Sequence, residues 1–329
     1  MILDIIIPQY KEKEEEVKIL LDSIASQKDV DFNLIYVTIV NDKSDVLLTD
    51  EFISKYSLLH TKFLINDKNT GPGLARQKGI DNTLGDYIMF VDSDDYLEND
   101  YVLKTIFDVC EKRHPLYIVS NIVTKTLRDD KLVNVVRKGL DTMPWMHGKV
   151  YLRKHLEDNN IRFHDVIREL EDSYFTNCVI GTMNPKDICY LNYNTIFWTV
   201  NPISITRKPR KYPYLVDIFD EYFITPEYIY EFLCRHKSQM RFTFYVTSVI
   251  GRYILLNCNL FDFIELNEKR NNYKAKLDEL IKKRKNLFRL FTVEQLKTIY
   301  KNEERALALR NNIEKIYVDF DLFYTKVIE

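Results

Sequence analysis

The sequence predicts an α/β fold, in which a mostly parallel sheet has helices on both faces, followed by an all-helical domain. Two observations predict the sheet. Four short apolar runs alternate with helical patterns over the first 97 residues, and each run ends in polar residues. A third observation predicts the helical domain, because beyond residue 206 apolar residues recur at helical spacing almost to the last residue.

The four apolar runs are expected to be the strands of the sheet. The first, Leu3–Pro8, is β-branched and stops at a proline, and the second is Phe32–Val40. The third is Lys62–Ile65 and the fourth is Tyr87–Val91, which follows a helix predicted over Leu74–Thr83. Consecutive β-α-β units place the carboxyl ends of their strands at one edge of the sheet, so the polar residues after each strand are expected to meet there.

The composition describes a folded chain without a dominant charge. It has 329 residues, enough for two domains, and its 47 basic and 49 acidic residues give a net charge of -2, which does not demand a nucleic-acid partner. The five cysteines include no C-x-x-C pair, so we expect free thiols in a reducing compartment. Met1–Pro8 has no basic start, and polar residues interrupt Phe242–Phe261. We therefore expect a cytoplasmic protein, at most attached to the inner face of the membrane, without a signal peptide or transmembrane segment.

Three carboxylates follow the fourth apolar run. Asp92, Asp94 and Asp95 lie around Ser93, where the strand ends. Clustered carboxylate oxygens suit Mg²⁺ or Mn²⁺, and these ions suit phosphates. Acids in this position are also typical of turns and helix N-caps. We expect that second role for Asp95, ahead of a helix beginning near Leu97.

Short motifs follow all four predicted strands. They are PQYK in Pro8–Lys11, VNDKSD in Val40–Asp45, NTGPGLARQKG in Asn69–Gly79 and DSDD in Asp92–Asp95, and further segments of interest are Trp145–Tyr151, Glu171-Asp172 and Tyr193–Thr206. In this order and spacing they resemble the motifs of glycosyltransferase family 2. Asn41 and Gln77 depart from the family pattern. The resemblance covers residues 1–206 and implies a GT-A domain, a Rossmann-like mixed sheet with a nucleotide-sugar half, 1–97, and an acceptor half, 98–206.

The resemblance implies that a UDP-sugar binds at the strand ends. The matching donor-binding positions are Pro8, Tyr10, Glu12, Asp42, Arg76, Asp92 and Ser93. Pro8 and Tyr10 would pack against the uracil, and Asp42 would accept a hydrogen bond from its N–H group. Arg76 would bridge the diphosphate or the Asp92 cluster. The metal, Mn²⁺ or Mg²⁺, would be held by Asp94 with Asp92 as its partner.

The resemblance also implies the catalytic base and the side of the acceptor. The family's base is the aspartate of the E-D pair, which makes Asp172 the first candidate and Glu171 the second, both at a predicted helix start. In-line attack assisted by a single base implies inversion at the anomeric carbon. Trp145, His147 and Lys149 are the acceptor-side candidates, although a buried tryptophan beside a loop is an equally good reading of the first.

Residues 207–329 resemble no family. Arg207–Pro213 is expected to be a basic linker, and Thr225-Pro226 to be the N-cap and first residue of a helix. The later helical patterns predict three or four helices in all. Lys282–Lys285 is a run of four basic residues, typical of a solvated helix face. It is also typical of contact with an anionic surface, such as membrane headgroups, teichoic-acid phosphates or nucleic acid, and homo-oligomer formation is a further role left open.

The sequence therefore predicts a metal-dependent, inverting glycosyltransferase that moves a hexose or N-acetylhexosamine from a UDP-sugar to an acceptor hydroxyl. By the resemblance, the acceptor is a cell-envelope polysaccharide or a teichoic-acid-like polymer. Two alternatives stay open: a phage-type glycosyltransferase that acts on nucleic acid or protein, and a non-catalytic sugar-binding protein of the same fold. The presence of Asp42, Asp94 and Asp172 together favours an enzyme over the second alternative.

Overall fold

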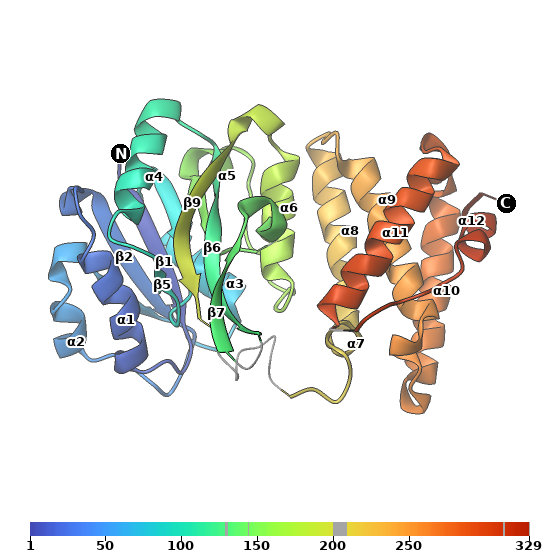
Figure 1. The fold of residues 1–329 in the computed structure, drawn as a ribbon, viewed down its shortest axis with the longest axis horizontal. Helices are drawn as coiled ribbons and strands as arrows, with labels where there is room; N and C mark the ends of the chain where they lie inside the picture. Colours follow the sequence, from blue (N-terminus) through green and yellow to red (C-terminus); the bar gives the residue numbers. More distant parts are fainter. Residues whose placement is uncertain (129–130, 144, 200–208, 312, 329) are drawn as a thin grey trace. The chain divides into compact units, whose positions relative to one another are not determined.

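The structure of the chain is a computed structural model, and it describes residues 1–128, 131–143, 145–199, 209–311 and 313–328. The chain divides into two compact units, residues 1–204 and 205–329 (Figure 1). The predicted domain boundary at residue 206, the predicted Pro202–Thr206 segment and the start of the predicted linker fall outside the described residues.

The first four strands of the first unit form the parallel half of a mixed sheet. They are β1 (Leu3–Gln9), β2 (Ile35–Asn41), β3 (Lys62–Ile65) and β4 (Tyr87–Phe90), in the spatial order β3-β2-β1-β4. Parallel pairing joins β1 to β2 and to β4, and β2 to β3. All four predicted strands are confirmed. The second begins at Ile35, later than predicted, because a short 3₁₀ turn capped by Asp31 precedes it.

The other strands extend the sheet beyond β4 in the spatial order β4-β8-β6-β9-β5, and β7 pairs with β6 outside this order. They are β5 (Tyr96–Leu97), β6 (Tyr117–Arg128), β7 (Lys131–Arg137), β8 (Lys149–Leu152) and β9 (Ile188–Trp198). β8 is antiparallel to β4, with Met89 opposite Val150, so the loop before β8 lies at the carboxyl end of β4. This antiparallel neighbour brings a loop of the second half of the unit to the predicted ligand edge.

Helices cover both faces of the sheet (Figure 1). They are α1 (Glu14–Ala25), α2 (Asp50–Ser54), α3 (Pro72–Asp81), α4 (Val102–Arg113), α5 (Arg153–Asp158) and α6 (Glu171–Gly181). Side chains alternate between the faces of a strand. In β1, Ile5 therefore belongs to the core that also holds the apolar faces of α1 and α4, whereas Ile6 meets Gly79 of α3 on the other face. The predicted α/β arrangement is confirmed.

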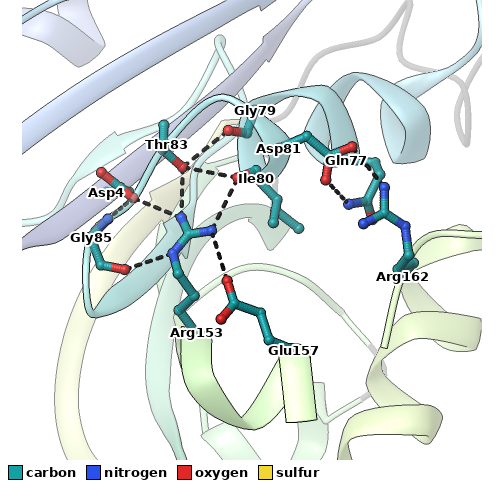
Figure 2. A network of polar contacts seen from close by, with 10 residues as sticks. All are labelled: Asp4, Gln77, Gly79, Ile80, Asp81, Thr83, Gly85, Arg153, Glu157 and Arg162. Atoms are coloured by element: carbon teal, nitrogen blue, oxygen red, sulfur yellow. Dashed lines mark hydrogen bonds and ion pairs between the residues drawn. The ribbon is translucent and has the colours of Figure 1, made fainter. Parts of the chain in front are cut away.

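A buried arginine fixes α5 to the amino end of this sheet (Figure 2). Arg153 donates from Nε to the carbonyl oxygen of Gly85 at 2.7 Å and from Nη1 to that of Ile80 at 3.0 Å. Its Nη2 contacts the carboxylate of Asp4 at 2.8 Å and the hydroxyl of Thr83 at 2.6 Å. One side chain thus satisfies groups at the start of β1 and in the turn between α3 and β4, on the side opposite the predicted ligand edge.

The second unit is helical in its described part. Its helices are α7 (Tyr214–Asp217), α8 (Phe219–Arg235), α9 (Arg241–Asn257), α10 (Asn267–Lys283), α11 (Val293–Arg310) and α12 (Phe320–Ile328). The apolar α9 is buried among α8, α10 and α11. Among the described residues, we find no helix with the length and apolar character needed to cross a membrane. All five cysteines are free.

The prediction that Thr225-Pro226 starts a helix is wrong. Helix α8 begins at Phe219 and continues through Pro226. Proline removes an N–H donor from a helix interior and usually breaks it. Here the fully buried Arg252 of α9 donates from Nη1 to the carbonyl oxygen of Phe223 at 2.9 Å and pairs through Nη2 with Glu227 at 2.9 Å. These tertiary contacts hold the turn around the proline.

Candidate active site

The candidate site lies at the carboxyl ends of β1, β2 and β4, where Asp42 and Asp92 follow their strands as predicted. Two further elements reach this edge. One is the loop before β8, which carries His147, and the other is the start of α6, which carries Glu171 and Asp172. The predicted helix start at the E-D pair is confirmed, since α6 begins at Glu171.

Arg76 of α3 connects the strand end to the start of α6. Its buried guanidinium contacts Asp92 through Nη2 at 2.6 Å and Glu171 through Nη1 at 3.0 Å. Of the two roles predicted for Arg76, the structure contains the contact with Asp92. The half-buried Asp172 accepts from the backbone N–H of Ser173 at 2.6 Å, and it interacts electrostatically with Arg76, His147 and Asp92. The acids that follow β4 and those that start α6 therefore share one site.

Three possible metal ligands converge beside Arg76. The Nε2 atom of His147 lies 3.3 Å from an oxygen of Asp92 and 3.3 Å from an oxygen of Asp95. Within the described residues, these three side chains form the group whose ligand atoms lie close enough together to hold one ion. Neither the Oδ2 atom of the buried Asp95 nor the ring nitrogens of His147 has a well-directed hydrogen bond there. Two carboxylate oxygens and an imidazole nitrogen are a donor set that Mn²⁺ accepts.

The position of Asp95 corrects the expectation that it caps the next helix. Helix α4 begins at Val102, and Asp95 instead accepts a hydrogen bond from the backbone N–H of Thr199 at 2.8 Å. Asp94, the predicted metal ligand, is half-buried and stands outside the converging group. Its metal role stays a prediction. His147, which we predicted on the acceptor side, lies among the acids.

The charges of these groups shift one another's pKa values. Burial alone would raise the pKa of Asp92, but Arg76 and His147 outweigh it and hold that pKa well below its usual range. Burial alone would lower the pKa of His147, but the facing carboxylates of Asp92 and Asp95 raise it to about 10. Burial, with Asp172 next to it, raises the pKa of Glu171 to about 8, and burial also raises the pKa of Asp172.

The exit of β1 carries the first predicted donor-binding residues. Pro8 is buried within β1, where it pairs with Val40, while Tyr10 is 44% exposed. The carboxylate of Glu12 turns back to accept from the backbone N–H of Tyr10 at 2.7 Å. Burial raises the pKa of Glu12, which also interacts with the buried Ser93 and with Asp94. Glu12 therefore adds a carboxylate to the strand-end cluster.

Asp42 anchors the loop before α3. Its carboxylate accepts from the backbone N–H groups of Thr70 and Gly71, at 2.9 and 2.7 Å, and from the side chain of Asn66 at 2.8 Å. This explains the N-x-G part of the motif, since Gly71 has a φ of 88°, a backbone conformation that favours glycine. The predicted contact of Asp42 with a uracil stays a prediction.

The other acceptor-side candidates lie around the His147 loop. The half-buried ring of Trp145 lies 5.2 Å from that of Trp198, and the His147 ring lies 5.4 Å from Trp198. Lys149 is fully buried, and its Nζ donates to the hydroxyl of Thr142 at 3.2 Å and to the carbonyl oxygen of His147 at 3.0 Å. These contacts support a structural role for Lys149, and its contact with an acceptor stays a prediction.

A mixed sheet with acids and an arginine at its carboxyl edge agrees with the GT-A domain that the sequence motifs imply. Residues 4–164 match the sequence model described as "Glycosyl transferase family 2". This part of the chain belongs to glycosyl transferase family 2, and the resemblance found in the sequence is confirmed.

Similar proteins include bacterial glycosyltransferases. "Glycosyltransferase GlyA" of Streptococcus pneumoniae is 36% identical over 101 residues, which are 30% of this chain and 14% of that protein. "Poly(ribitol-phosphate) beta-N-acetylglucosaminyltransferase TarS" of Staphylococcus aureus is 23% identical over 189 residues, 54% of this chain and 32% of that protein. The chain therefore spans well under two thirds of the length of these relatives.

The fold also matches a solved structure. The crystal structure of residues 1–349 of S. aureus TarS in complex with UDP-GlcNAc superposes with a TM-score of 0.60 at 18% identity, over 95% of this chain and 93% of that one. The likeness establishes the GT-A fold with an additional C-terminal helical region, as predicted.

Proposed function

We propose that the protein is a metal-dependent, inverting glycosyltransferase that moves a hexose or N-acetylhexosamine from a UDP-sugar to a hydroxyl of a cell-envelope polymer. Family membership supports the reaction class. The relative TarS, by its name, transfers N-acetylglucosamine to poly(ribitol phosphate), and its structure with UDP-GlcNAc supports this donor class. The acceptor proposed here is accordingly a polymer of the teichoic-acid kind.

The contact of one arginine with two acids carries the proposal. Arg76 touches both Asp92, at the end of β4, and Glu171, at the start of α6. A cation binder at a strand end and a candidate base at a helix start are thereby held beside the same guanidinium. A sugar donor and its acceptor hydroxyl react only when they are held close together, so this convergence supports a transferase.

The donor set of the site fits a divalent cation. Asp92, Asp95 and His147 converge, and Asp95 and His147 each have a buried polar atom without a well-directed hydrogen bond. We propose that Asp92 and His147 hold the ion, that Asp95 orients His147, and that Asp94 completes the site from its half-exposed position. When bound, such an ion neutralises charge on the departing diphosphate.

Asp172 is proposed as the general base. It is half-buried and lies in the first turn of α6, and burial raises its pKa above the ordinary value, which makes its carboxylate a stronger base. The buried Glu171, whose carboxylate is engaged by Arg76, is proposed to position the helix start. Attack assisted by one base on the face opposite the diphosphate gives inversion.

The first experiment measures UDP release from UDP-N-acetylglucosamine and UDP-glucose with Mn²⁺ and a ribitol-phosphate or polysaccharide acceptor. Asp172→Asn should lower the rate by about 10²- to 10⁴-fold, the usual contribution of a general base, while UDP binding stays unchanged. Equal rates for parent and variant would remove Asp172 from the mechanism. A parent protein without activity on any UDP-sugar and metal would overturn the function itself.

The second experiment tests the cation site by calorimetry of UDP binding with and without Mn²⁺. His147→Gln and Asp94→Asn should each remove most of the Mn²⁺-dependent part of the affinity. If Asp94→Asn binds UDP as the parent does while His147→Gln does not, Asp94 is not a ligand and Asp95 takes its place. If neither change matters, the metal assignment fails.

A further inference from the structure

One end of the helical unit carries a concentration of positive charge. The two segments that form it, residues 235–244 and 281–292, contain eight lysines and arginines and no aspartate or glutamate. The first segment joins α8 to α9, and the second joins α10 to α11. We call these two segments the basic end.

Contacts of Arg284 show that the two segments lie together. Its guanidinium stacks over the ring of Tyr230 in α8 at 4.6 Å and over that of Tyr245 in α9 at 4.7 Å. It also pairs with Glu227 of α8 at 2.8 Å, and the hydroxyl of Tyr245 donates to the carbonyl oxygen of Leu280 at 3.2 Å. The ends of α8 and α10 and the start of α9 therefore meet at one end of the unit.

Four other basic side chains there form no ion pair within the described part of the chain, although Lys283 lines one pocket together with Glu227, Glu231 and Glu279. Lys282, Lys283 and Arg289 are exposed and Lys285 is half-buried, and among the described residues none of the four is in an ion pair. Elsewhere in the unit some basic residues pair with acids, as Lys269 does with Asp220 at 2.9 Å, and others, such as Lys301 and Lys315, form no ion pair among the described residues. The basic end is therefore distinguished by the absence of acids within its two segments.

Helix dipoles do not explain this charge. The C-terminal ends of α8 and α10 favour cations, but the start of α9 favours anions, and its first turn has Arg241 and no acid. The last turns of two helices call for about one compensating positive charge between them, far fewer than the basic end carries. The excess is available to an external anionic partner.

Apolar side chains stand among these charges. Leu290, next to Arg289, is 59% exposed, and Phe242 and Phe291 are half-buried. The guanidinium carbon of Arg241 lies 4.1 Å from the centre of the Phe242 ring. A free polyanion offers a leucine no apolar partner, whereas the surface of an anionic lipid bilayer accommodates both apolar and basic side chains.

We propose that the basic end of the helical unit binds the surface of an anionic membrane. Lysines of this end lie against the headgroups, and Leu290 enters the boundary with the acyl chains. This places the chain at a membrane surface and is independent of the transfer reaction proposed above, whose proposed site residues all belong to the first unit.

The test is co-sedimentation of the full chain with vesicles of phosphatidylcholine containing 30% phosphatidylglycerol, at low salt. Each lysine near such a surface contributes about fivefold to binding, so Lys282→Ala/Lys283→Ala/Lys285→Ala should lower the partition coefficient by about 100-fold. Leu290→Ser should lower it by about tenfold. The matched control, Lys269→Ala/Lys301→Ala/Lys315→Ala, removes the same charge from exposed or half-buried positions elsewhere and should change it by less than about threefold.

Thermal unfolding of each variant shows that the helical unit is intact. Equal binding by the parent and the Lys282 triple variant would overturn the proposal, and so would equal binding to vesicles of phosphatidylcholine alone. Binding of soluble polyphosphate without binding of vesicles would also overturn it, and would assign the basic end to a polymer. Loss of glycosyltransferase activity without loss of vesicle binding would concern the first unit alone.

Discussion

Lys149→Met is expected to stabilise the first unit near neutral pH and to lose that advantage at alkaline pH. The ammonium group of Lys149 is fully buried and donates to the hydroxyl of Thr142 and the carbonyl oxygen of His147. Among the described residues, no carboxylate forms an ion pair with it. Burial therefore lowers the pKa of Lys149 to about 7.

The magnitude follows from proton linkage. Unfolding restores the pKa of the lysine to about 10.4, and each pKa unit corresponds to about 1.4 kcal/mol, so desolvation costs about 4 kcal/mol at pH 7. Between the two pKa values the unfolded chain binds more protons, so the stability rises with pH across this window and the cost is complete below pH 7. Methionine has a similar shape without the charge and loses two hydrogen bonds worth about 1 kcal/mol each. The net gain is about 2 kcal/mol at pH 7 and reaches zero at about pH 9, and at about pH 10 the variant is less stable than the parent by about 1 kcal/mol.

The chain offers a direct assay. Its two tryptophans, Trp145 and Trp198, both belong to the first unit, so their fluorescence reports urea unfolding of that unit alone. The difference between parent and variant is measured from pH 6 to pH 10, and exposed Lys154→Met serves as the control with a difference below about 0.5 kcal/mol. A variant that is less stable than the parent at pH 6, or a difference that does not change with pH, would refute the reasoning.

Three further outcomes are expected from the same fluorescence assay. Gly79→Ala should destabilise the unit by about 2 kcal/mol, because the added Cβ would stand 2.3 Å from Cγ2 of Ile6. Combining it with Ile6→Ala should restore part of this loss, and additive effects of the two substitutions on the free energy of unfolding would contradict the contact. Arg153→Met should lower the free energy of unfolding by about 3 to 5 kcal/mol, because it removes the ion-pair partner of the buried Asp4. Adding Asp4→Asn should recover part of that loss. If Arg153→Met does not change the free energy of unfolding, the network does not stabilise the unit. Mn²⁺ should raise the unfolding midpoint of the parent but not of His147→Gln, and an equal rise in both would remove His147 from the cation site.

The parallel half of the sheet could be predicted because its signals are local. Each strand is a short apolar run, and each ends in polar residues whose direction follows from β-α-β topology. Asp92 and the E-D pair at Glu171 could be located in this way, since a strand end and a helix start are both visible in the sequence. The motifs did not indicate that β4 pairs with β8.

That pairing explains why His147, which was predicted on the acceptor side, lies among the acids. In the antiparallel register, Met89 lies opposite Val150. Asp92 lies three residues after Met89, and His147 lies three residues before Val150. The two side chains therefore meet beyond the ends of their strands. A prediction that β8 is the antiparallel neighbour of β4 would have placed His147 among the acids. The contact between Arg153 and Asp4, which are 149 residues apart, has no comparable sequence motif and could not be predicted.

The charge balance of the candidate site bears on the metal binding and the transfer reaction that we propose for it. Six carboxylates lie around two cationic groups, Arg76 and His147: those of Glu12, Asp92, Asp94, Asp95, Glu171 and Asp172. Burial raises the pKa values of four of them, so folding brings together more negative charge than the two cations compensate. A dianionic diphosphate would be repelled by such a site, whereas a divalent cation would be attracted and would displace the proton from His147. For the proposed transferase we therefore expect the cation to bind before or together with the nucleotide sugar, and the affinity for the cation to rise with pH as the imidazole gives up its proton.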